Sequence, residues 1–367
     1  MAEKTIDIDN SPRFGFRKVK IHNERLGEGS YGVVRKATCD DTLPCAAKLF
    51  HSVFFKSNDP GISVMKKKFE EECKLMGRIR HPCIVQYLQT VQDPESDRPI
   101  LLMELMDETL TKFLKRSSGP LAFQLQVNLS YDIALALAYL HSNGVVHRDL
   151  SSNNVLISAG VKAKVADIGM LKMLVNEQRS YMTKCPGAAV YMPPEALTDD
   201  PVYTYKLDCF SFGVVIIQII TRNFPAPTKA TITVTDSKSP TGCVQMPVPE
   251  KERRKKDLDL IDTHHHLRPI ALDCIKDKEK ERPSAENLCH RLVDLKKEKQ
   301  YSTSLDQAQE HQQDTGMQQL KVQDTMAQNE IDDLEQEVSS EISLSSEQCL
   351  TSKVGSYFIL IAIMEHV

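Results

Sequence analysis

Two carboxylates and an amide follow one another at fixed spacings in the middle of the chain. Asp149 and Asn154 belong to the run HRDLSSNN, residues 147–154, and Asp167 stands thirteen residues further on, after the apolar segment 163–166. A carboxylate such as Asp149 can accept the proton of an attacking hydroxyl or orient that hydroxyl. Asn154 and Asp167 offer the hard oxygen ligands that Mg²⁺ prefers. The spacing therefore predicts a phosphoryl-transfer site in which Mg²⁺ bridges the phosphates.

A glycine-rich run, GEGSYG at residues 27–32, lies near the start of the chain. Its spacing alone is weak, because a dinucleotide-binding fingerprint of the same form requires a helix to begin at the last glycine. Here the run continues into the strand-like segment 33–37, so it is predicted to form the tip of a β-hairpin. Glycines in such a tip let backbone N–H groups approach phosphates closely.

A lysine follows the glycine-rich run on a short apolar strand. Lys48 stands sixteen residues after Gly32 and directly follows Ala46 and Ala47. From that strand it would point into the same cleft and meet the phosphates; the alternative is an ordinary surface lysine. A buried lysine needs a carboxylate partner. The apolar period over residues 64–80 predicts a helix whose phase places Glu72 near its apolar face, so Glu72 is the expected partner.

The pattern of apolar residues divides the main part of the chain into two regions. Alternating apolar and polar residues predict strands in 21–50, 84–91 and 99–105. From Leu121 the pattern predicts a long helix that ends at Gly144, and short strands follow in 145–166. Further helices are predicted at 206–221, 267–276 and 284–297. The predicted fold class is α+β, bilobal, with a small β-rich N-terminal lobe, a larger α-helical C-terminal lobe and a cleft between them.

Charge marks off a C-terminal tail. Residues 300–350 hold eleven acidic side chains and one basic side chain, a net charge of −10, whereas the whole chain carries −4. We therefore expect an N-terminal arm at 1–19, a domain at 20–297, an acidic tail at 298–350 and a short apolar C-terminus at 351–367. Heptad-spaced apolar residues in 317–341 favour a helix for self-association or a partner helix, whereas the polar composition favours a disordered tail; both remain open.

Composition excludes several classes of protein. A pI of about 6.3 without a global basic excess argues against a nucleic-acid partner. No apolar stretch reaches the roughly 20 residues of a membrane span. The nearest approach is YFILIAIM at 357–364, expected to be a strand or a docked tail, with a weak membrane or partner contact as the alternative.

The ten cysteines lack zinc-site spacing and indicate reduced thiols in a cytoplasmic protein. The histidine run 264–266 is expected in a solvated loop.

Seven motifs follow one another between about residues 20 and 297: the glycine-rich run, Lys48, HRDLSSNN, DIG at 167–169, MPPE at 192–195, KLDCFSFG at 206–213 and ERPS at 281–284. In this order they resemble the motifs of eukaryotic protein kinases, with DIG in place of DFG and MPPE in place of APE, and their wording is most similar to the tyrosine-kinase-like group. The resemblance implies an ATP-dependent protein kinase with Mg²⁺ as cofactor. Its expected substrates are Ser or Thr hydroxyls of proteins, with Tyr as the alternative, and its expected setting is intracellular signalling.

The resemblance also assigns roles to residues of this chain. It implies a catalytic set of Asp149, Lys48, Glu72, Asn154 and Asp167, with Asn154 and Asp167 as metal ligands. It implies that Met103 is the gatekeeper and that Glu104 to Met106 form the hinge that reads adenine. The implied ATP-binding residues are Leu26, Gly27, Glu28, Gly29, Ser30, Tyr31, Gly32, Val33, Val34, Ala46, Lys48, Met103, Glu104, Met106 and Leu156. Two structural roles are implied as well, Asp208 holding the catalytic loop and Glu195 pairing with Arg282.

Two departures from the family pattern bear on activity. Serine/threonine kinases usually carry a lysine where this chain has Ser151, and a threonine where it has Ala188. Tyrosine kinases show other residues at these places, so the sequence matches neither pattern fully. The rival interpretation is a catalytically weak nucleotide-binding pseudokinase scaffold that recruits partners through its tail. A small-molecule kinase is disfavoured, because the substrate loop ending in Pro194 and Glu195 is present.

Overall fold

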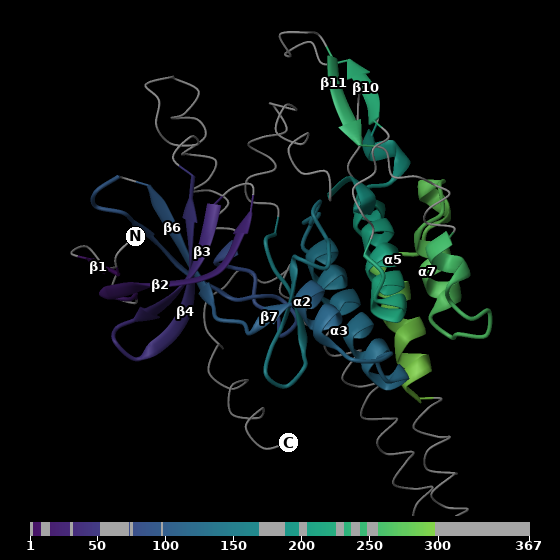
Figure 1. Ribbon diagram of the computed structural model, residues 1–367, viewed down its shortest axis with the longest axis horizontal. Helices are drawn as coiled ribbons and strands as arrows, with labels where there is room; N and C mark the ends of the chain where they lie inside the picture. The colour runs from purple at the N-terminus through teal and green to yellow at the C-terminus, as the bar shows by residue number, and fades with distance from the viewer. Residues whose placement is uncertain are drawn as a thin grey trace, which may run out of the picture.

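The computed structural model contains a lobe of β-strands and a larger lobe of helices, arranged next to each other in Figure 1. It describes residues 3–8, 15–29, 32–51, 73, 76–96, 98–168, 188–197, 204–224, 231–235, 243–247 and 256–297, and for 231–235 and 243–247 it describes the backbone alone. This arrangement confirms the α+β, bilobal fold that the sequence predicts.

The small lobe is one antiparallel sheet with the strand order β1-β2-β3-β4-β6-β5. Its strands are β1 (Lys4–Asp7), β2 (Lys18–Gly29), β3 (Gly32–Cys39), β4 (Leu43–Phe50), β5 (Tyr87–Gln92) and β6 (Pro99–Glu104). Alternation along these strands buries one face of the sheet, where Val19, Ala37, Ala47 and Leu102 have no exposed surface. That buried face holds in register the central strands that carry Lys48 and the hinge.

Strand β1 lies inside the segment expected as an N-terminal arm, and the sequence pattern did not predict it. It pairs with the start of β2, and Ile6 is 3% exposed in the core of the lobe. The Lys4 ammonium also reaches the turn after β5, 2.5 Å from Asp93 and 2.9 Å from Glu95. Because β1 and β5 are the two edges of the sheet, this ion pair ties the edges together and curls the sheet.

The hairpin between β3 and β4 sets the place of Lys48. Asp40 and Asp41 take positive φ angles of 46° and 60° in its turn, a conformation that short polar residues tolerate. The register of the hairpin places Lys48 opposite Val34. Gly32 at the start of β3 lies so close to β4 that a Cβ atom there would collide with the carbonyl of Leu49. Glycine at this position therefore lets the glycine-rich run pass directly beside the lysine strand.

The large lobe is built from helices around one apolar core. Its helices are α2 (Leu110–Arg116), α3 (Phe123–Ser142), α5 (Tyr205–Thr221), α7 (Arg268–Cys274) and a last helix over 285–297. Three short strands, β7 (Glu108–Thr109), β8 (Val155–Ile157) and β9 (Ala163–Val165), form a second sheet. Short 3-10 turns are η3 (Ala188–Tyr191), η4 (Pro194–Leu197) and η5 (Glu279–Glu281). Helices α3 and α5 cross the core and are buried along most of their length.

Most predicted elements of the large lobe are confirmed. The long helix after Leu121 is α3, and Gly144 follows it with a φ of 75°, as a helix-ending glycine does. A hairpin of β10 (Thr231–Thr235) and β11 (Cys243–Pro247) was not predicted, although the run TITVT alternates like a strand. Of the predicted helix 64–80, residues 73 and 76–80 are described: 73 and 76 are helical, whereas 77–80 form a turn and an irregular segment, so the predicted end of the helix at residue 80 is wrong. The predicted heptad region 317–341 and the whole tail lie outside the described residues.

The two lobes meet through backbone hydrogen bonds as well as through the hinge. Residues 83–85 run beside β9, where the Val85 N–H donates to the Val165 carbonyl at 2.9 Å. In return, the Val165 N–H donates to the Cys83 carbonyl at 2.8 Å. Since β9 leads directly to Asp167, the small lobe fixes the strand that delivers this carboxylate.

The unexpected strand β1 generates a stability prediction. Ile6→Ala should lower the free energy of unfolding by about 2 kcal/mol, because it removes a buried aliphatic side chain at the sheet edge. Guanidinium denaturation followed by circular dichroism measures the change. Thr5→Ala, on the exposed face of the same strand, is the matched control and should stay within about 0.5 kcal/mol of the parent. Equal effects of the two substitutions would contradict a structural role for β1.

Candidate active site

The loop that carries Asp149 is held by a carboxylate with no exposed surface. Asp208, in the first turn of α5, accepts the backbone N–H groups of His147 and Arg148, each at 2.8 Å. Charge-assisted bonds of this kind are shorter and stronger than neutral ones. The predicted role of Asp208 in holding this loop is confirmed by these two bonds.

A histidine that the sequence interpretation missed completes the surroundings of Asp208. His141, in the last turn of α3, places Nε2 at 2.8 Å from the same carboxylate. Its ring stacks against Tyr205 at the start of α5, with 4.9 Å between ring centroids. The sequence feature that could have pointed to His141 is its position at the end of a long apolar helix, just before the glycine that ends the helix. His141 thus joins α3, α5 and the loop at one carboxylate.

The side chain of His147 connects the loop to the strand before Asp167. It is fully buried, with Nε2 2.8 Å from the Ala166 carbonyl and Nδ1 3.2 Å from the Asp149 backbone N–H. The carbonyl requires Nε2–H as donor and the N–H requires Nδ1 as acceptor, which fixes the neutral tautomer of the ring. The histidine therefore couples the position of Asp149 to the end of β9.

Asn154 ties the same two segments from the other side. Its Nδ2 donates to the Asp149 carbonyl at 2.7 Å, and its own carbonyl accepts the Ala166 N–H at 2.8 Å. Two backbones nearby are held at unusual angles, with a φ of 64° at Arg148 and 58° at Asp167. Positive φ at residues other than glycine is costly and concentrates at functional sites. The three side chains predicted at the centre of the site, Asp149, Asn154 and Asp167, are brought together in this way.

Lys48 faces this centre from the small lobe. Its side chain is 10% exposed, and its ammonium forms an ion pair with the carboxylate of Asp167, whose side chain is 41% exposed. A buried ammonium requires such a partner, because burial without one is strongly unfavourable. Glu72, the partner predicted from helical phase, lies outside the described residues, and its pairing with Lys48 stays a prediction. The contact between Lys48 and Asp167 joins the small lobe to the large lobe at this site.

The glycine-rich run forms the end of the β2–β3 hairpin, as predicted. Gly27 and Glu28 pair with Val34 and Val33 across the hairpin, and Gly29 pairs with Gly32. Gly27, Glu28 and Gly29 are exposed, so backbone groups at this tip are open to a ligand. Ser30 and Tyr31, which complete the predicted phosphate loop, lie outside the described residues.

Apolar residues assigned to the adenine site contact one another at the hinge. Met103 and Leu156, one from each lobe, pack with the buried side chains of Val85, Met106 and Ala166. Ala46 is 5% exposed on the strand that carries Lys48, whereas Leu26 and Val34 are half-buried near the hairpin tip. This small cluster supplies an apolar wall next to the charged centre.

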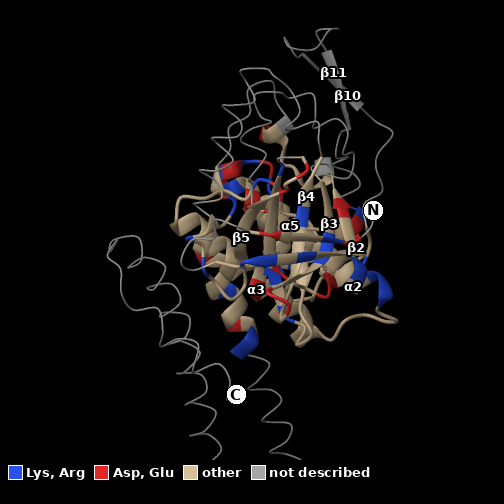
Figure 2. Ribbon diagram, turned by 90° about the vertical axis from the view of Figure 1, so that its left-hand side faces the viewer, with Lys and Arg blue, Asp and Glu red and all other residues tan. Residues whose placement is uncertain are grey.

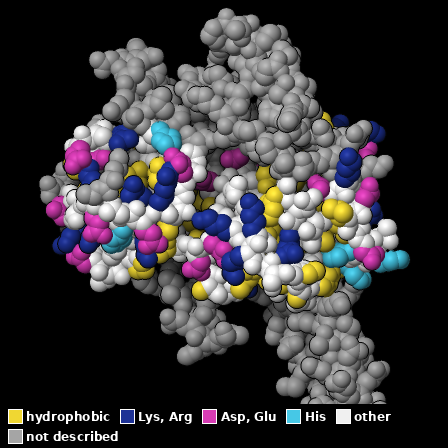
Figure 3. Space-filling model, in the orientation of Figure 1, with side chains coloured by type: hydrophobic (Ala, Val, Ile, Leu, Met, Phe, Trp, Pro, Cys, Tyr) yellow, Lys and Arg dark blue, Asp and Glu magenta, His cyan; other side chains and the backbone are white. Residues whose placement is uncertain are grey.

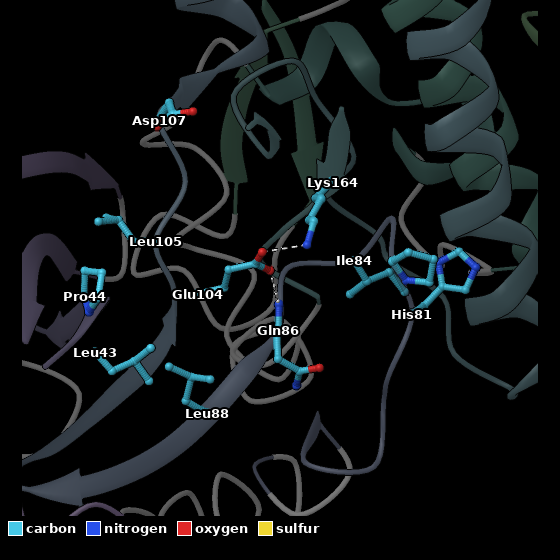
Figure 4. A pocket seen from close by; sticks show the side chains of 11 residues that line it. Leu43, Pro44, His81, Ile84, Gln86, Leu88, Glu104, Leu105, Asp107 and Lys164 are labelled. Carbon is cyan, nitrogen blue, oxygen red and sulfur yellow. Dashed lines mark hydrogen bonds and ion pairs between the residues drawn. The ribbon is translucent and has the colours of Figure 1, made fainter. Parts of the chain in front are cut away.

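The hinge residue Glu104 directs its side chain away from that wall. One carboxylate oxygen lies 2.6 Å from the Lys164 ammonium, and the other accepts the Gln86 N–H at 3.2 Å. Figure 4 shows this ion pair in a pocket whose walls include the start of β4 and the segment after His81. Burial, together with the nearby Lys164 charge, lowers the pKa of His81 to about 4. The Glu104 carboxylate is therefore engaged in this pocket and not at the apolar wall of Met103 and Leu156.

The ion pair predicted between Glu195 and Arg282 is confirmed. The guanidinium of Arg282 has no exposed surface and binds the carboxylate through two bonds of 2.5 and 2.9 Å. Its other donors reach the carbonyls of Lys276, Asp277 and Lys206, and its plane lies 5.0 Å from the Phe210 ring. A buried arginine needs every donor satisfied. This pair fastens the end of the substrate loop to the core of the large lobe.

A buried chain of hydroxyl groups, which the sequence interpretation missed, joins the catalytic loop to the substrate loop. The Ser152 hydroxyl lies 2.7 Å from that of Thr111 and 3.0 Å from that of Tyr191. The Tyr191 hydroxyl also accepts the Gln218 amide at 2.9 Å. No periodicity reveals such a network, because its members come from four separate segments. Its effect is to hold Ser151 and the rest of the loop against η3.

The histidine run was expected in a solvated loop, and this expectation is wrong for His265. His265 is half-buried, with Nε2 3.0 Å from the Gln126 amide oxygen, and its ring lies 5.6 Å from that of Phe123. The packing follows from the apolar segment that begins α7 directly after the run. Figure 3 shows the histidine side chains gathered at the edge of the large lobe near α7. Within the described part of the chain, no group of three or more His, Cys, Asp or Glu is arranged to hold a metal.

Comparison with known proteins places the site in a family. Residues 21–293 match the protein kinase domain model, so the chain belongs to the protein kinase family. The chain is 30% identical over 270 residues to a probable serine/threonine-protein kinase of Dictyostelium discoideum, a match covering 73% of this chain and 41% of the relative. It is 28% identical over 313 residues to the probable serine/threonine-protein kinase kinY of the same organism, covering 80% and 49%.

A third relative comes from a mammal. Similarity to the serine/threonine-protein kinase TNNI3K of Mus musculus is 29% identity over 210 residues, covering 57% of this chain and 24% of the relative. The chain spans less than half the length of each of these three relatives. The resemblance to eukaryotic protein kinases is thus confirmed, and these relatives are consistent with the tyrosine-kinase-like group. Among the described helices, none combines the length and apolar character needed to cross a membrane.

The three bonds to Asp208 generate a prediction about the loop. Asp208→Asn should lower the free energy of unfolding by about 3 kcal/mol, because the amide replaces an acceptor oxygen with donors facing buried N–H groups. The amides of His147 and Arg148 should also exchange hydrogen faster. Guanidinium denaturation and hydrogen exchange with mass spectrometry measure the two effects. Asp294→Asn, at an exposed carboxylate, is the control; an unchanged exchange rate in Asp208→Asn would contradict the anchoring role.

Proposed function

We propose that this chain is an ATP-dependent protein kinase that transfers the γ-phosphoryl group to serine or threonine hydroxyls of protein substrates. The observation that carries the proposal is the ion pair of Lys48 with Asp167, together with the Asp149 loop that buried Asp208 holds in place. The serine/threonine kinases among the relatives support the class of hydroxyl. Among the described residues, the seven cysteines form no disulfide, which supports a cytoplasmic setting, where signalling is the proposed role.

The arrangement supports a role for Asp149 at the substrate hydroxyl. Its backbone N–H is held by His147 and its carbonyl by Asn154, so the carboxylate is positioned before a substrate arrives. The side chain itself is half-buried at the cleft. Positioning of reacting groups is a large part of the catalytic effect in phosphoryl transfer, which needs little covalent chemistry from the protein. Asp149 then accepts or orients the proton of the attacking hydroxyl.

Lys48 supports the binding of the nucleotide phosphates. Its ammonium is buried beside the hairpin of the glycine-rich run, and Asp167 is its partner. A cation in a partly water-excluded site stabilises negative charge more strongly than one in bulk water. Lys48 therefore orients the phosphates, while the exposed backbone of Gly27 to Gly29 covers them.

Asn154 and Asp167 fit a magnesium ion by the chemistry of their donors. Asn154 uses Nδ2 on the Asp149 carbonyl, which leaves Oδ1 of the same amide as the oxygen for a cation. Asp167 contributes a carboxylate that is 41% exposed at the cleft. Oxygen donors of this kind suit Mg²⁺, with substrate phosphates completing the ligand set. When bound, Mg²⁺ neutralises charge that develops on the phosphates.

A substitution at Asp149 tests the proposal against the pseudokinase interpretation. Asp149→Asn should lower turnover with Mg-ATP and a generic protein substrate at least about 100-fold, because the proton acceptor is lost. ATP binding, measured by calorimetry, should change little, because Asp149 acts on the hydroxyl and not on the nucleotide. Asp294→Asn is the matched control at an exposed site. A parent protein that binds ATP but transfers no phosphate would favour the pseudokinase interpretation, and a fully active Asp149→Asn would contradict the role of Asp149.

Ser151 provides a second test, directed at the class of hydroxyl. Ser151 is buried in the loop, at the position where serine/threonine kinases carry a lysine near the transferred phosphate. A positive charge there stabilises charge in transfer, so Ser151→Lys should raise turnover about fivefold. Ser151→Met, with a side chain of similar length but no charge, is the control. Phosphoamino-acid analysis should find phosphoserine or phosphothreonine; exclusive phosphotyrosine, or a loss of activity in Ser151→Lys alone, would contradict the assignment.

A further inference from the structure

A pocket of about 560 Å³ lies behind the hinge, on the side that the Glu104 carboxylate faces. Its walls come from both lobes. Leu43 and Pro44 at the start of β4 and Leu88 of β5 form one side, and Ile84 and Leu105 add further apolar surface. Pockets of 300–1,000 Å³ with apolar walls and a few fixed polar groups are typical of binding sites. The nucleotide mechanism proposed above does not use this pocket.

The polar floor of the pocket is fixed in place. Lys164 and Glu104 form their 2.6 Å ion pair there, and the Gln86 N–H holds the second carboxylate oxygen. Both ion-pair side chains keep some exposure, 20% for Lys164 and 30% for Glu104. This ion pair thus lies in a hollow that is lined by six apolar residues and by three further polar ones, His81, Gln86 and Asp107.

The rim of the pocket carries a large apolar side chain in contact with water. Leu43 is 42% exposed and is one of four exposed large hydrophobic residues in the described part of the chain. A single exposed leucine is ordinary on a protein surface. An exposed leucine at the mouth of an apolar pocket extends the surface that an apolar ligand can bury.

The described chain ends close to this pocket. In the last helix, Lys296 lies over the Tyr131 ring of α3, with its ammonium 4.3 Å from the ring centroid. Eight residues further along α3, about 12 Å by helical rise, Tyr139 stacks on His81 at 4.9 Å between ring centroids. His81 is part of the pocket wall. The described chain therefore ends beside a part of α3 that lies about 12 Å, measured along the helix, from the residue that contacts the pocket wall.

Basic residues lie in the region of residue 297, where the described chain ends, and of the pocket. Lys162 is exposed at the start of β9, Lys164 follows it at the pocket floor, and Arg80 is exposed next to His81. Asp132 of α3 anchors the same strand by accepting the Ala163 N–H at 3.0 Å. In Figure 2 the Lys and Arg positions, blue on the ribbon, form several separate groups over the domain. The basic group beside residue 297 is opposite in sign to the tail that follows it, since residues 300–350 carry a net charge of −10.

We infer that residues 357–364, YFILIAIM, dock into the pocket behind the hinge of the same chain. Within residues 298–367 this is the one run of eight consecutive apolar side chains, and burial of such side chains is favourable by roughly 1.5–3 kcal/mol each. The 59 residues between Lys297 and Tyr357 bridge the short distance easily, since a random coil of that length spans about 40 Å. Tethering gives the segment an effective concentration in the millimolar range.

Photo-cross-linking in the full-length protein tests this inference. With p-benzoylphenylalanine in place of Leu43, irradiation should join the pocket rim to residues 357–364 within one chain, as read by peptide mass spectrometry. The same substitution at Leu260, which is 67% exposed and does not line the pocket, is the matched control. The cross-link from position 43 should exceed that from position 260 by about tenfold, because docking raises the local concentration of the segment at one place only.

Hydrogen exchange supplies an independent measurement. Ile359→Asp combined with Ile361→Asp should speed exchange of amides in 86–88 and 104–107 by about tenfold, since protection scales with the occupied fraction. Leu344→Asp, an equal type of change elsewhere in the tail, should leave those amides unchanged. A cross-link to position 43 between two chains would show a second copy as the occupant and overturn the inference. Equal cross-linking at 43 and 260, or equal exchange in all variants, would also overturn it; none of these results bears on the kinase proposal, which the Asp149→Asn assay tests separately.

Discussion

The buried carboxylate of Asp208 is the interaction on which the geometry of the site depends. A carboxylate removed from water is unfavourable unless its oxygens are satisfied, and Asp208 meets this requirement with two loop N–H groups and His141. The cost of burying the charge therefore favours this loop conformation, because another course of residues 147–148 would remove two of the three donors that Asp208 has. The backbone of Arg148 has a positive φ, which is unfavourable for a residue other than glycine. The hydrogen bonds from residues 147 and 148 to Asp208 offset this strain.

The same logic extends outward from that centre through a second buried ion. Arg282 has its donors distributed over Glu195 and three carbonyl groups, so the substrate loop and the segment before the last helix have fixed places relative to α5. Between these two ions runs the neutral chain of Ser152, Tyr191 and Gln218. The large lobe thus acts as a rigid base in which the polar groups, more than the apolar core, specify where the loops lie.

Sequence reasoning reached local features and family roles more readily than contacts between distant segments. Helical period and the glycine after it located α3, and alternation located most strands of the small lobe. Strand β1 was missed because its four residues carry a single buried side chain, Ile6, which is too little for a period to register. His141 and the chain through Ser152 were missed because hydrogen bonds between separate segments leave no spacing in the sequence. For the same reason the surroundings of His265 differ from the expected solvated loop.

The hinge strand β6 connects the two sites discussed above. Met103 at its end and Met106 just after it pack in the apolar cluster predicted to face adenine, while the side chain of Glu104 faces the opposite pocket and binds Lys164. Lys164 belongs to β9, the strand that continues into Asp167, and Asp167 pairs with Lys48 across the cleft. An occupant of the rear pocket that contacts Lys164 therefore acts on the strand that sets Asp167. Met103 and Glu104, which are adjacent on β6 and face opposite sides, together with β9 thus link the rear pocket to the site between the lobes.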